Sequence, residues 1–378
     1  MEKVQLFFAT NRRHEGDNQW KPTSYGKKIS SSGHENLRFG ELELDFNPKT
    51  VQQYIDRQYG DGIIGDGEGL SNYFTEQSKQ ADITAYEDLT ITKERRVELE
   101  ESSSFQFFNN LKDLMMNTTD VLIYIHGFNV SWDEAVGGAL SLQYMLNSKR
   151  KNSDRELKVV LFSWPSDGSM MPYIAYRSDR ADARDSSKAV GRAILKLKKY
   201  LAWLRAKADK DEVQLCEGNI HLLCHSMGNY VLQKSLEDKV DGYSKGTSLP
   251  RIFSQVFLCS ADVKDDVLEV GKGLSRLHEM ASSITVYYNH GDAALATSAY
   301  TKNLSERLGH TGNALPASVH NKVHQVDCGP VVHGFVEHSY YLWGSVNRDI
   351  WQNVAGIPVD AVGRRRRRNG QNREWVMV

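Results

Sequence analysis

The chain has 378 residues, and its 47 lysine and arginine residues nearly balance 48 aspartate and glutamate residues, for a formal charge of −1. This balance excludes a whole-chain positive field that would attract nucleic acid, while the 40% hydrophobic share can fill a sizeable core. No apolar run approaches the about 18–20 residues that span a bilayer, and the first residues lack the order of a secretory signal. The four cysteines are scattered without a CxxC pair, so we expect buried free thiols and a cytoplasmic location.

The first segments of the chain read as strands. Val4–Ala9 is a continuous apolar run, and Leu37–Phe46 alternates apolar and polar residues. The alternation changes phase at Gly40, which predicts a β-bulge there. We expect the second segment to be an antiparallel, half-exposed strand near the edge of a sheet.

Residues 48–105 are polar, rich in glycine and charge, and short of strong strand patterns. Residues 60–65 match GxGxxG, but a helix-like segment precedes them instead of the strand that a dinucleotide site requires. We therefore expect no nucleotide and no other cofactor, and we interpret residues 48–105 as a polar, flexible insertion.

From residue 105 onward, buried strands alternate with helices. The predicted strands are Val121–Ile125, Val159–Phe162, Ile220–Cys224, Ile252–Cys259, Ile284–Tyr288 and Val323–Val326. The predicted helices are Phe105–Met116, Trp132–Asn147, Asp179–Ala208, Met227–Leu236 and His338–Val354. This order predicts an α/β fold with a mostly parallel central sheet and helices on both faces.

We expect one domain over residues 1–355 and a basic tail over residues 356–378. The tail contains five consecutive arginines, Arg364–Arg368. Such a run can bind nucleic acid or anionic lipid, but a solvated tail is the simpler interpretation, and no specific nucleic-acid partner is expected.

Ligands of parallel sheets bind outside the carboxyl ends of the strands, so the residues that follow each strand are the candidates for chemistry. Ser226 follows one predicted strand and precedes a helix, with the small residues Cys224 and Gly228 on either side. A sharp strand-to-helix turn of this kind exposes a nucleophilic hydroxyl, although the usual pattern has glycine where Cys224 stands. The alternative is an ordinary helix N-cap serine.

A serine nucleophile requires a histidine base that is oriented by a carboxylate. Asp292 follows the next strand but one after Ser226, and we favour it as the acid over Asp262, which follows the strand in between. His338 stands beyond the last predicted strand, and we favour it as the base over His333. For any single histidine, a structural role is the alternative.

Two further groups complete the predicted site. The backbone N–H groups of Met227 and Phe128 are the expected oxyanion donors, because each follows a strand at the same edge of the sheet. Trp132, Trp164 and Tyr173 lie after strands and are candidates for an apolar acyl-binding pocket, with ordinary core packing as the alternative. No cluster has metal-ligand spacing, so no metal is expected.

Several motifs together resemble a bacterial α/β-hydrolase family of uncharacterised function: VLIYIHGFNVSWDEAV, FSWPSDG, LLCHSMGNYVL, YYNHGDAAL and EHSYYLW, with FFATNRR and FGELELDF near the start. The resemblance spans most of residues 1–355. It implies the α/β-hydrolase fold and serine hydrolase chemistry, with Ser226, Asp292 and His338 as the triad. The HSMG core also occurs in many lipases and esterases, so it selects no substrate.

Two functions of different classes follow. The first is a serine hydrolase that cleaves a small-molecule or lipid carboxylic ester or thioester through an acyl-enzyme intermediate. The second is a catalytically inactive binding or signalling module, which the unusual Cys224 and the arginine run motivate. An acyltransferase that uses the same triad lies between them. The substrate and the oligomeric state stay open.

Overall fold

The structure is a computed structural model that describes residues 1–59, 63–87, 102–116, 119–150, 155–166, 172–240, 242, 247–296, 305–332, 338–370 and 372–378, with the side chains of 172–175, 177 and 239 left out. Its helices are α1 (Pro48–Ile55), α2 (Gly67–Ser78), α3 (Ser103–Met115), α4 (Trp132–Asn147), α5 (Pro172–Ala208), α6 (Gly228–Ser235), α8 (Leu277–Met280), α10 (Leu308–Thr311) and α11 (Gly344–Val354). Its strands are β1 (Glu2–Thr10), β2 (Arg12–Glu15), β3 (Ser24–Ile29), β4 (Arg38–Phe46), β5 (Gln58–Tyr59), β6 (Ile63–Ile64), β7 (Asp82–Ala85), β8 (Thr119–Ile125), β9 (Glu156–Ser163), β10 (Ile220–His225), β11 (Phe253–Cys259), β12 (Ala281–Tyr288), β13 (Val323–Asp327), β14 (Arg366–Arg368) and β15 (Glu374–Met377).

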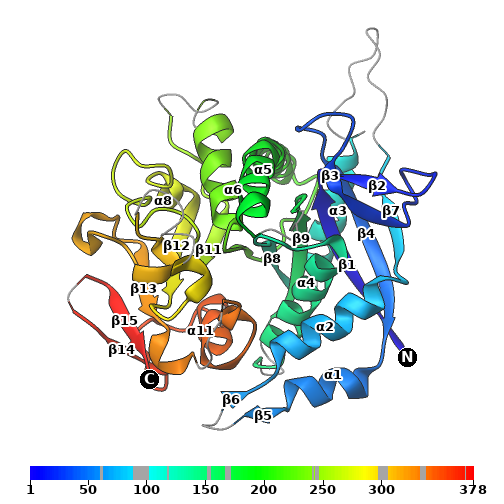
Figure 1. The fold of residues 1–378 in the computed structure, drawn as a ribbon. Coiled ribbons are helices and arrows are strands. Elements are labelled where there is room, and N and C mark those ends of the chain that lie inside the picture. The colour runs from blue at the N-terminus through cyan, green and yellow to red at the C-terminus, as the bar shows by residue number, and fades with distance from the viewer. Residues whose placement is uncertain are drawn as a thin grey trace.

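Within the described ranges, the main sheet has the order β14-β15-β13-β12-β11-β10-β8-β9-β1-β4-β7. The strands from β15 to β1 in this order pair in parallel, and β14, β4 and β7 are antiparallel to their neighbours. Figure 1 shows the sheet running through the molecule, with the two ends of the chain far apart. The predicted α/β class with a mostly parallel sheet is therefore confirmed.

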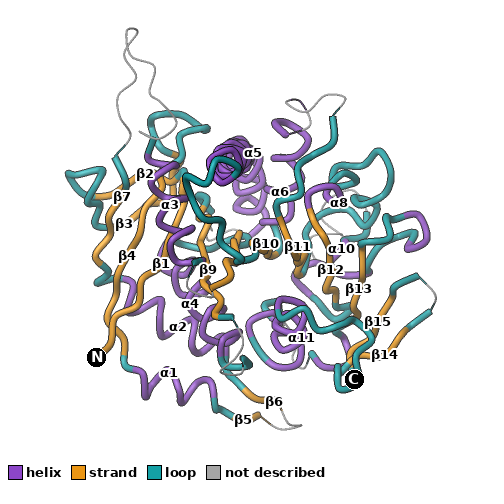
Figure 2. Tube along the Cα trace, turned by 180° about the vertical axis from the view of Figure 1, so that it is seen from behind, coloured by secondary structure: helices purple, strands orange, loops and turns teal. Residues whose placement is uncertain are grey.

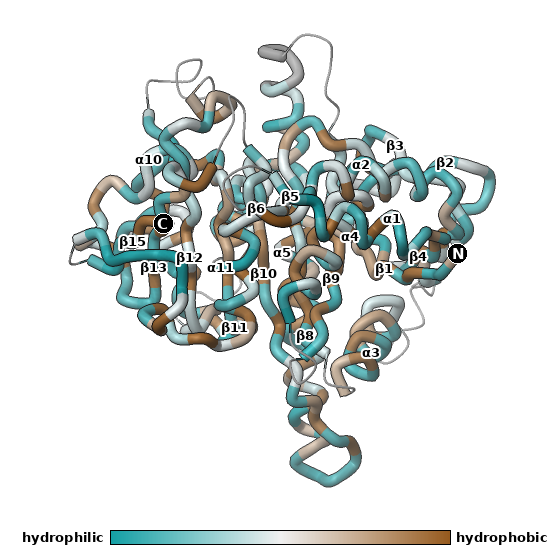
Figure 3. Tube along the Cα trace, turned by 90° about the horizontal axis from the view of Figure 1, so that it is seen from below, coloured by the Kyte–Doolittle hydropathy of each residue, from teal (hydrophilic) through white to brown (hydrophobic). Residues whose placement is uncertain are grey.

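Helices cover both faces of this sheet. One core cluster packs α3, α5 and α6 against one face, and the other packs α2, α4 and α11 against the opposite face. Figure 2 shows the same layers from behind. The middle parts of the central strands are mostly hydrophobic, as Figure 3 shows, in agreement with the cover on both of their faces. The carboxyl ends of β8, β10, β11 and β12 consequently meet at one edge.

The strand β4 corrects one prediction. Its register with β1 is continuous, with Phe8 opposite Gly40, so the bulge predicted there is wrong. Phe39 packs in the cluster beneath α3, whereas Leu42 and Leu44 pack in the cluster beneath α2. The change of phase therefore marks a strand that is buried on one face at its start and on the other face further along.

The described part of the expected insertion is folded. Residues 48–55 form α1 and residues 67–78 form α2, and the Ser141 hydroxyl of α4 donates to the Gly67 carbonyl at the start of α2, at 2.6 Å. Strand β7 pairs with β4 at the edge of the main sheet. The interpretation of this region as flexible is therefore wrong for residues 63–86, which complete one edge of the fold. Residues 88–101 lie outside the described residues.

The basic tail also belongs to the sheet. β15 pairs in parallel with β13, and β14 pairs with β15, beyond the boundary expected at residue 355. Arg364 and Arg366 are each only 7% exposed, so the expectation of a fully solvated run is wrong at these two positions. Arg365 and Arg367, by contrast, are exposed. We propose that the domain extends to β15.

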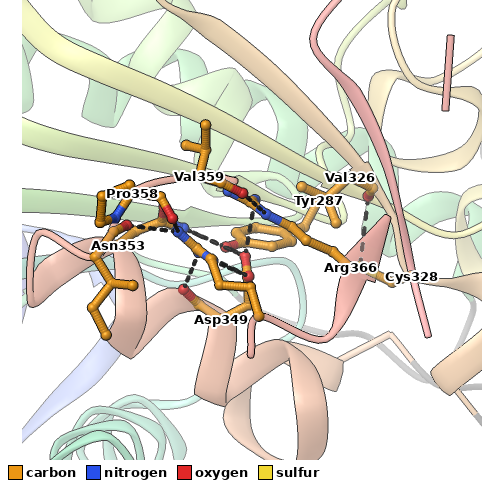
Figure 4. Close-up of polar contacts among 10 residues, drawn as sticks. Tyr287, Val326, Cys328, Asp349, Asn353, Pro358, Val359 and Arg366 are labelled. Carbon is orange, nitrogen blue, oxygen red and sulfur yellow. Dashed lines mark hydrogen bonds and ion pairs between the residues drawn. The ribbon is translucent and has the colours of Figure 1, made fainter. Parts of the chain in front are cut away.

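A carboxylate compensates the two buried arginines. Arg364 Nη2 lies 2.8 Å from Asp349 Oδ1, and Arg366 Nη1 lies 3.3 Å from Asp349 Oδ2. The Tyr287 hydroxyl donates to Asp349 Oδ2 at 2.7 Å, and the Asn353 amide donates to the Tyr287 hydroxyl at 2.9 Å. Figure 4 shows these side chains converging beneath the sheet. The cluster thus joins α11, β12 and the C-terminal strands.

Replacement of Asp349 by asparagine is expected to lower the free energy of unfolding by about 3–5 kcal/mol, because two buried guanidinium groups lose their compensating charge. Urea unfolding followed by circular dichroism measures this. Asp17→Asn, at an exposed position outside the cluster, is the control and should leave the midpoint nearly unchanged. Equal midpoints for Asp349→Asn and the wild type would contradict the proposed role of the cluster.

Candidate active site

Ser226 stands at a strained turn between β10 and α6. Its φ angle is 51°, in the left-handed region that residues other than glycine rarely adopt. The turn is held by a hydrogen bond from the Ser226 N–H to the Cys259 carbonyl at 3.0 Å. A Cβ atom at Gly228 would lie 2.6 Å from the Ile125 carbonyl oxygen, so only glycine fits this close approach of helix and strand.

The alternative of an N-cap serine finds no support in this geometry. Met227 occupies the N-cap position of α6, and no side chain caps that helix within the described residues. The Asn229 side chain instead stabilises the turn, because its amide donates to the carbonyls of Cys224 and Ser226 at 3.0 and 3.1 Å. The backbone of the turn is thus fixed without use of the Ser226 hydroxyl.

Asp292 and His338 form a close pair. His338 Nδ1 lies 2.7 Å from Asp292 Oδ2, although 46 residues separate them in the chain. The other oxygen of Asp292 accepts from the Leu295 N–H at 3.0 Å, and the carboxylate is 1% exposed. The fixed carboxylate therefore sets the orientation of the imidazole, which leaves Nε2 for another partner.

Two hydrogen bonds to the His338 carbonyl hold this residue beside the turn. His225 Nε2 lies 3.1 Å from it, and the Ser260 hydroxyl donates to it at 2.7 Å. Because a carbonyl only accepts, His225 carries its proton on Nε2. Burial, followed by the proximity of His338, holds the pKa of His225 well below its usual range, so its ring stays neutral. The rings of His225 and His338 lie 4.8 Å apart, which puts His338 next to the residue that precedes Ser226.

The rival acid, Asp262, faces a different set of groups. Its carboxylate lies 3.3 Å from Arg307 Nε and accepts a hydrogen bond from the Tyr176 hydroxyl. Its backbone N–H donates to the Ser226 carbonyl at 3.1 Å. Asp262 therefore supports the turn through its backbone, while its side chain neutralises a buried arginine.

The loop after β8 packs directly on the serine. A Cβ atom at Gly127 would lie 2.8 Å from the Ser226 Cβ, so a larger residue would displace one of the two segments. The loop then turns at Asn129, whose φ angle is 55°. Asp179 of α5 fixes this turn, because its Oδ2 accepts from the Asn129 N–H at 3.3 Å and from the Ser166 hydroxyl at 2.5 Å. Phe128 is held between these fixed points.

The chain matches one family, described as an alpha/beta hydrolase of unknown function (DUF900), over residues 101–345. The chain belongs to this family. The match includes the carboxyl ends of β8, β10, β11 and β12, and it confirms the resemblance that the motifs indicate. No match to a curated protein was found.

Two solved structures share features with this α/β hydrolase. An esterase from Pyrobaculum calidifontis is 14% identical, with a TM-score of 0.29, over 63% of this chain and 75% of that one. The peroxisomal α/β-hydrolase Lpx1 from Saccharomyces cerevisiae is 8% identical, with a TM-score of 0.36, over 95% of this chain and 91% of that one. These low scores carry no argument about the site, so the assignment rests on the family match and the sheet.

Among the described residues of this hydrolase, no group of three or more His, Cys, Asp or Glu side chains could hold a metal ion. Over the same ranges, none of the helices has the length and apolar character needed to cross a membrane. His333, the rival base, lies outside the described residues. Tyr173 lies in the first turn of α5, where side chains are not described.

Trp132 and Trp164 are core residues, which corrects their expected role in an acyl pocket. Trp132 is 2% exposed and packs on Phe8 and Tyr25, with ring centroids 5.1 and 4.7 Å away. Trp164 is fully buried and stacks on His126, and its indole N–H donates to the His126 carbonyl at 2.9 Å. Trp164 therefore supports the loop after β8 from behind.

His126 also supports the loop after β8, as a buried and neutral hydrogen-bond acceptor. Burial, and then the nearby Arg12 charge, lower its pKa to about 3. Its Nε2 accepts from the Trp164 N–H at 3.2 Å. Arg12 in turn donates to the Val130 carbonyl at 2.7 Å and to the Ser163 hydroxyl at 2.8 Å, so the loop after β8 is anchored at both ends.

Acid is expected to destabilise the fold through His126. The unfolded chain takes up this proton below its usual pKa of about 6.5, whereas the folded chain does so only near pH 3. The free energy of unfolding should therefore fall by about 1.4 kcal/mol per pH unit between these values on account of this group. Urea titrations from pH 7 to 4 should give a shallower pH slope for His126→Gln, which keeps an acceptor. An unchanged slope would contradict the neutral assignment.

The contacts of Asp179 and Ser260 near the site could not be predicted from the sequence. Asp179 is the first residue of the predicted helix Asp179–Ala208 and lies inside α5, where a charged residue is expected to face solvent. Ser260 has a φ angle of 44°, and a serine after a strand carries no local sign of such strain. Ser226, Ser260 and Asp292 each follow a strand, directly or shortly after its end, at the same edge of the sheet. This shared position is the sequence signal that could have drawn attention to Ser260.

Replacement of Asp179 by asparagine is expected to lower kcat by about 10- to 100-fold with little change in KM, because the loop after β8 loses the carboxylate that fixes its turn. Steady-state kinetics on an activated ester measures both constants. Asp185→Asn, on the same helix but half-exposed, is the matched control and should retain wild-type kcat. A kcat for Asp179→Asn equal to that of the control would remove the positioning role.

Proposed function

We propose that this α/β hydrolase is a serine hydrolase that cleaves a carboxylic ester or thioester through an acyl-enzyme intermediate. The observation that carries the proposal is the 2.7 Å contact between His338 Nδ1 and Asp292 Oδ2, in which His338 also contacts His225, the residue before a serine at positive φ. A histidine oriented in this way is the base that a serine hydroxyl requires to act as a nucleophile at neutral pH.

The proposed reaction begins when the Ser226 Oγ attacks the carbonyl carbon while His338 Nε2 takes its proton. Asp292 stabilises the imidazolium that forms, because its carboxylate already accepts the Nδ1 proton. The tetrahedral intermediate collapses when the leaving alcohol or thiol takes the proton from His338. Water, activated by the same imidazole, then attacks the acyl-enzyme and releases the acid.

The negative oxygen of the tetrahedral intermediate is assigned to the backbone N–H groups of Met227 and Phe128. Two features support this assignment. Met227 begins the first turn of α6, where the positive end of the helix lies. Phe128 follows Gly127, which packs against the Ser226 Cβ, and its loop is fixed by Asp179 and His126. A donor held in place before the reaction needs no reorganisation during it.

A cytoplasmic location is part of the proposal. Cys216, Cys224, Cys259 and Cys328 are free thiols, and the last three are buried. Burial raises the pKa of the Cys224 and Cys259 thiols, which keeps them protonated and unreactive. Free, buried thiols are typical of a reducing compartment.

A panel of p-nitrophenyl esters from acetate to decanoate, with a matched thioester series, tests the proposed function. Turnover of at least one member, with a burst of p-nitrophenol when deacylation is the slower step, is the expected result. The chain length that gives the highest kcat/KM then defines the acyl specificity. A folded protein that turns over no member of either series would oppose the proposal.

A further inference from the structure

A cavity of about 450 Å³ lies at the end of the sheet opposite to Ser226. Its walls include Ile220 and Phe253, which are the first residues of β10 and β11, whereas Ser226 follows the last residue of β10. At about 3.3 Å per residue, the length of β10 separates the cavity from the serine by about 20 Å. The cavity is therefore distinct from the proposed ester site.

Two helices turn apolar stripes toward this space. Leu197, Leu201 and Leu204 line it from α5 at the spacing of one helical face, and Phe107 and Leu111 line it from α3 in the same way. Both helices lie on the same face of the sheet, as Figure 1 and Figure 2 show. The cavity thus lies between an apolar sheet face and two apolar helix faces, and it is partly open to solvent.

A second space of about 70 Å³ adjoins the first. The two share Phe107, Ile123 and Phe253 in their walls. The smaller one has only hydrophobic residues around it among those described, and it extends toward Ile125 and Phe162 near the carboxyl ends of their strands. Together the two spaces run along the strands beneath α5, which suits a single extended hydrocarbon chain.

An apolar space of this size, partly open to solvent, is larger than the voids of an ordinary packed core. Protein interiors are packed as densely as organic crystals, and few of their voids exceed one water molecule. An apolar cavity holds water poorly, so its lining gains dispersion contacts when an apolar ligand enters. The volume falls within the about 300–1,000 Å³ of small-molecule sites.

The charged part of the wall is cationic. Lys112, Arg205 and Arg251 line the cavity, and no described carboxylate does. Arg205 forms an exposed pair with Asp209, which a ligand can replace at small cost, and Lys112, whose side chain is 16% exposed, pairs with the exposed Asp113. Arg251 is exposed and has no carboxylate within ion-pair distance in the described part of the chain. Charge complementarity therefore selects an anionic headgroup.

We propose that this cavity binds an amphiphile with one long hydrocarbon chain and an anionic carboxylate or phosphate head. The chain lies between the sheet and the leucine stripe of α5, and the head lies against Lys112 and Arg251. Binding here is independent of ester hydrolysis at Ser226, and it stands if that proposal fails.

Isothermal titration calorimetry of the full chain with sodium dodecanoate, dodecyl phosphate and dodecanol, below their micelle concentrations or solubility limits, tests the proposal. We expect saturable binding of at least one of the two anions, and its identity distinguishes a carboxylate from a phosphate ligand. The double variant Lys112→Gln/Arg251→Gln should weaken binding of that anion by roughly 5- to 30-fold. Arg13→Gln, an exposed arginine outside the cavity, should have no effect.

Two substitutions at one position test the location. Leu201→Trp fills the cavity and should abolish binding of the anion, whereas Leu201→Ala enlarges it and should retain binding. Ser226→Ala should bind with the wild-type Kd. The proposal is overturned if neither anion binds, if dodecanol binds as tightly as the preferred anion, or if a folded Leu201→Trp binds like the wild type. If Leu201→Trp fails to fold, the Lys112→Gln/Arg251→Gln result decides.

Discussion

Replacement of Ser226 by alanine is expected to lower kcat for any ester that the wild type cleaves by about 10⁴-fold or more. The reason is that the acyl-enzyme cannot form without the hydroxyl, and the remaining groups only bind and polarise the substrate. The fold should be kept, because the Asn229 side chain and the Cys259 carbonyl brace the turn through its backbone. Alanine at a positive φ angle adds no new strain beyond that already present in serine.

Single-turnover and steady-state kinetics on the best ester of the panel measure this loss. Ser148→Ala is the matched control, since its hydroxyl donates to the Met145 carbonyl at the end of α4, away from the site. The control should retain full activity. Turnover by Ser226→Ala within tenfold of the wild type, after removal of contaminating esterases, would eliminate this serine as the nucleophile.

Replacement of Asp292 by asparagine should lower kcat by about 10⁴-fold while the Ser226 turn stays intact. The asparagine amide would present a donor to His338 Nδ1, which would favour the tautomer with the proton on Nε2. That tautomer cannot accept the serine proton. The loss should shrink as pH rises, because hydroxide can replace the base; the pH profile of kcat is therefore the second readout.

Asp262→Asn provides the comparison for this prediction. Its side chain pairs with Arg307 and Tyr176, so the substitution should lower the free energy of unfolding but change kcat far less than Asp292→Asn does. Activity is compared per folded molecule, after urea titration of both variants. A larger loss of kcat for Asp262→Asn than for Asp292→Asn would reverse the assignment of the acid.

The central strands and the helices between them could be predicted because their signals are local. Val121–Ile125 and Ile220–Cys224 are continuous apolar runs, and the structure extends each by only one or two residues. The helix Trp132–Asn147 was predicted with the same bounds. A continuous apolar run of about 4–8 residues between helices is too short for a typical helix and therefore favours a strand buried on both faces.

The C-terminal strands could not be predicted, because their burial depends on partners elsewhere in the chain. Arg366 is a charged residue within a run of arginines, and such runs are ordinarily solvated. Only the carboxylate of Asp349 and the carbonyl of Val359, which accepts from its guanidinium at 3.2 Å, make its burial possible. Neither contact has a signature in the local sequence.

In the candidate site, too, some features could be predicted from the sequence and others could not. That Asp292 and His338 lie at the same edge of the sheet as Ser226 could be predicted, because chain order and strand ends constrain their places. The roles of the tryptophans could not, since Trp132 is buried by Phe8 and Tyr25 from the start of the chain. The predicted helix from His338 also begins later, at Gly344, whose φ angle of 64° precedes a regular helix. His338 therefore lies in a loop, where neighbouring side chains hold it.

Labelling with a fluorophosphonate, followed by intact-mass spectrometry and peptide mapping, tests the proposed chemistry most directly. The reagent phosphonylates only a serine that a neighbouring base has activated. We predict one adduct per wild-type chain, located at Ser226, with no adduct on Ser226→Ala and strongly slowed labelling of His338→Ala. A folded wild-type protein that stays unlabelled, or one that carries the adduct at another residue, would contradict the assignment of this site.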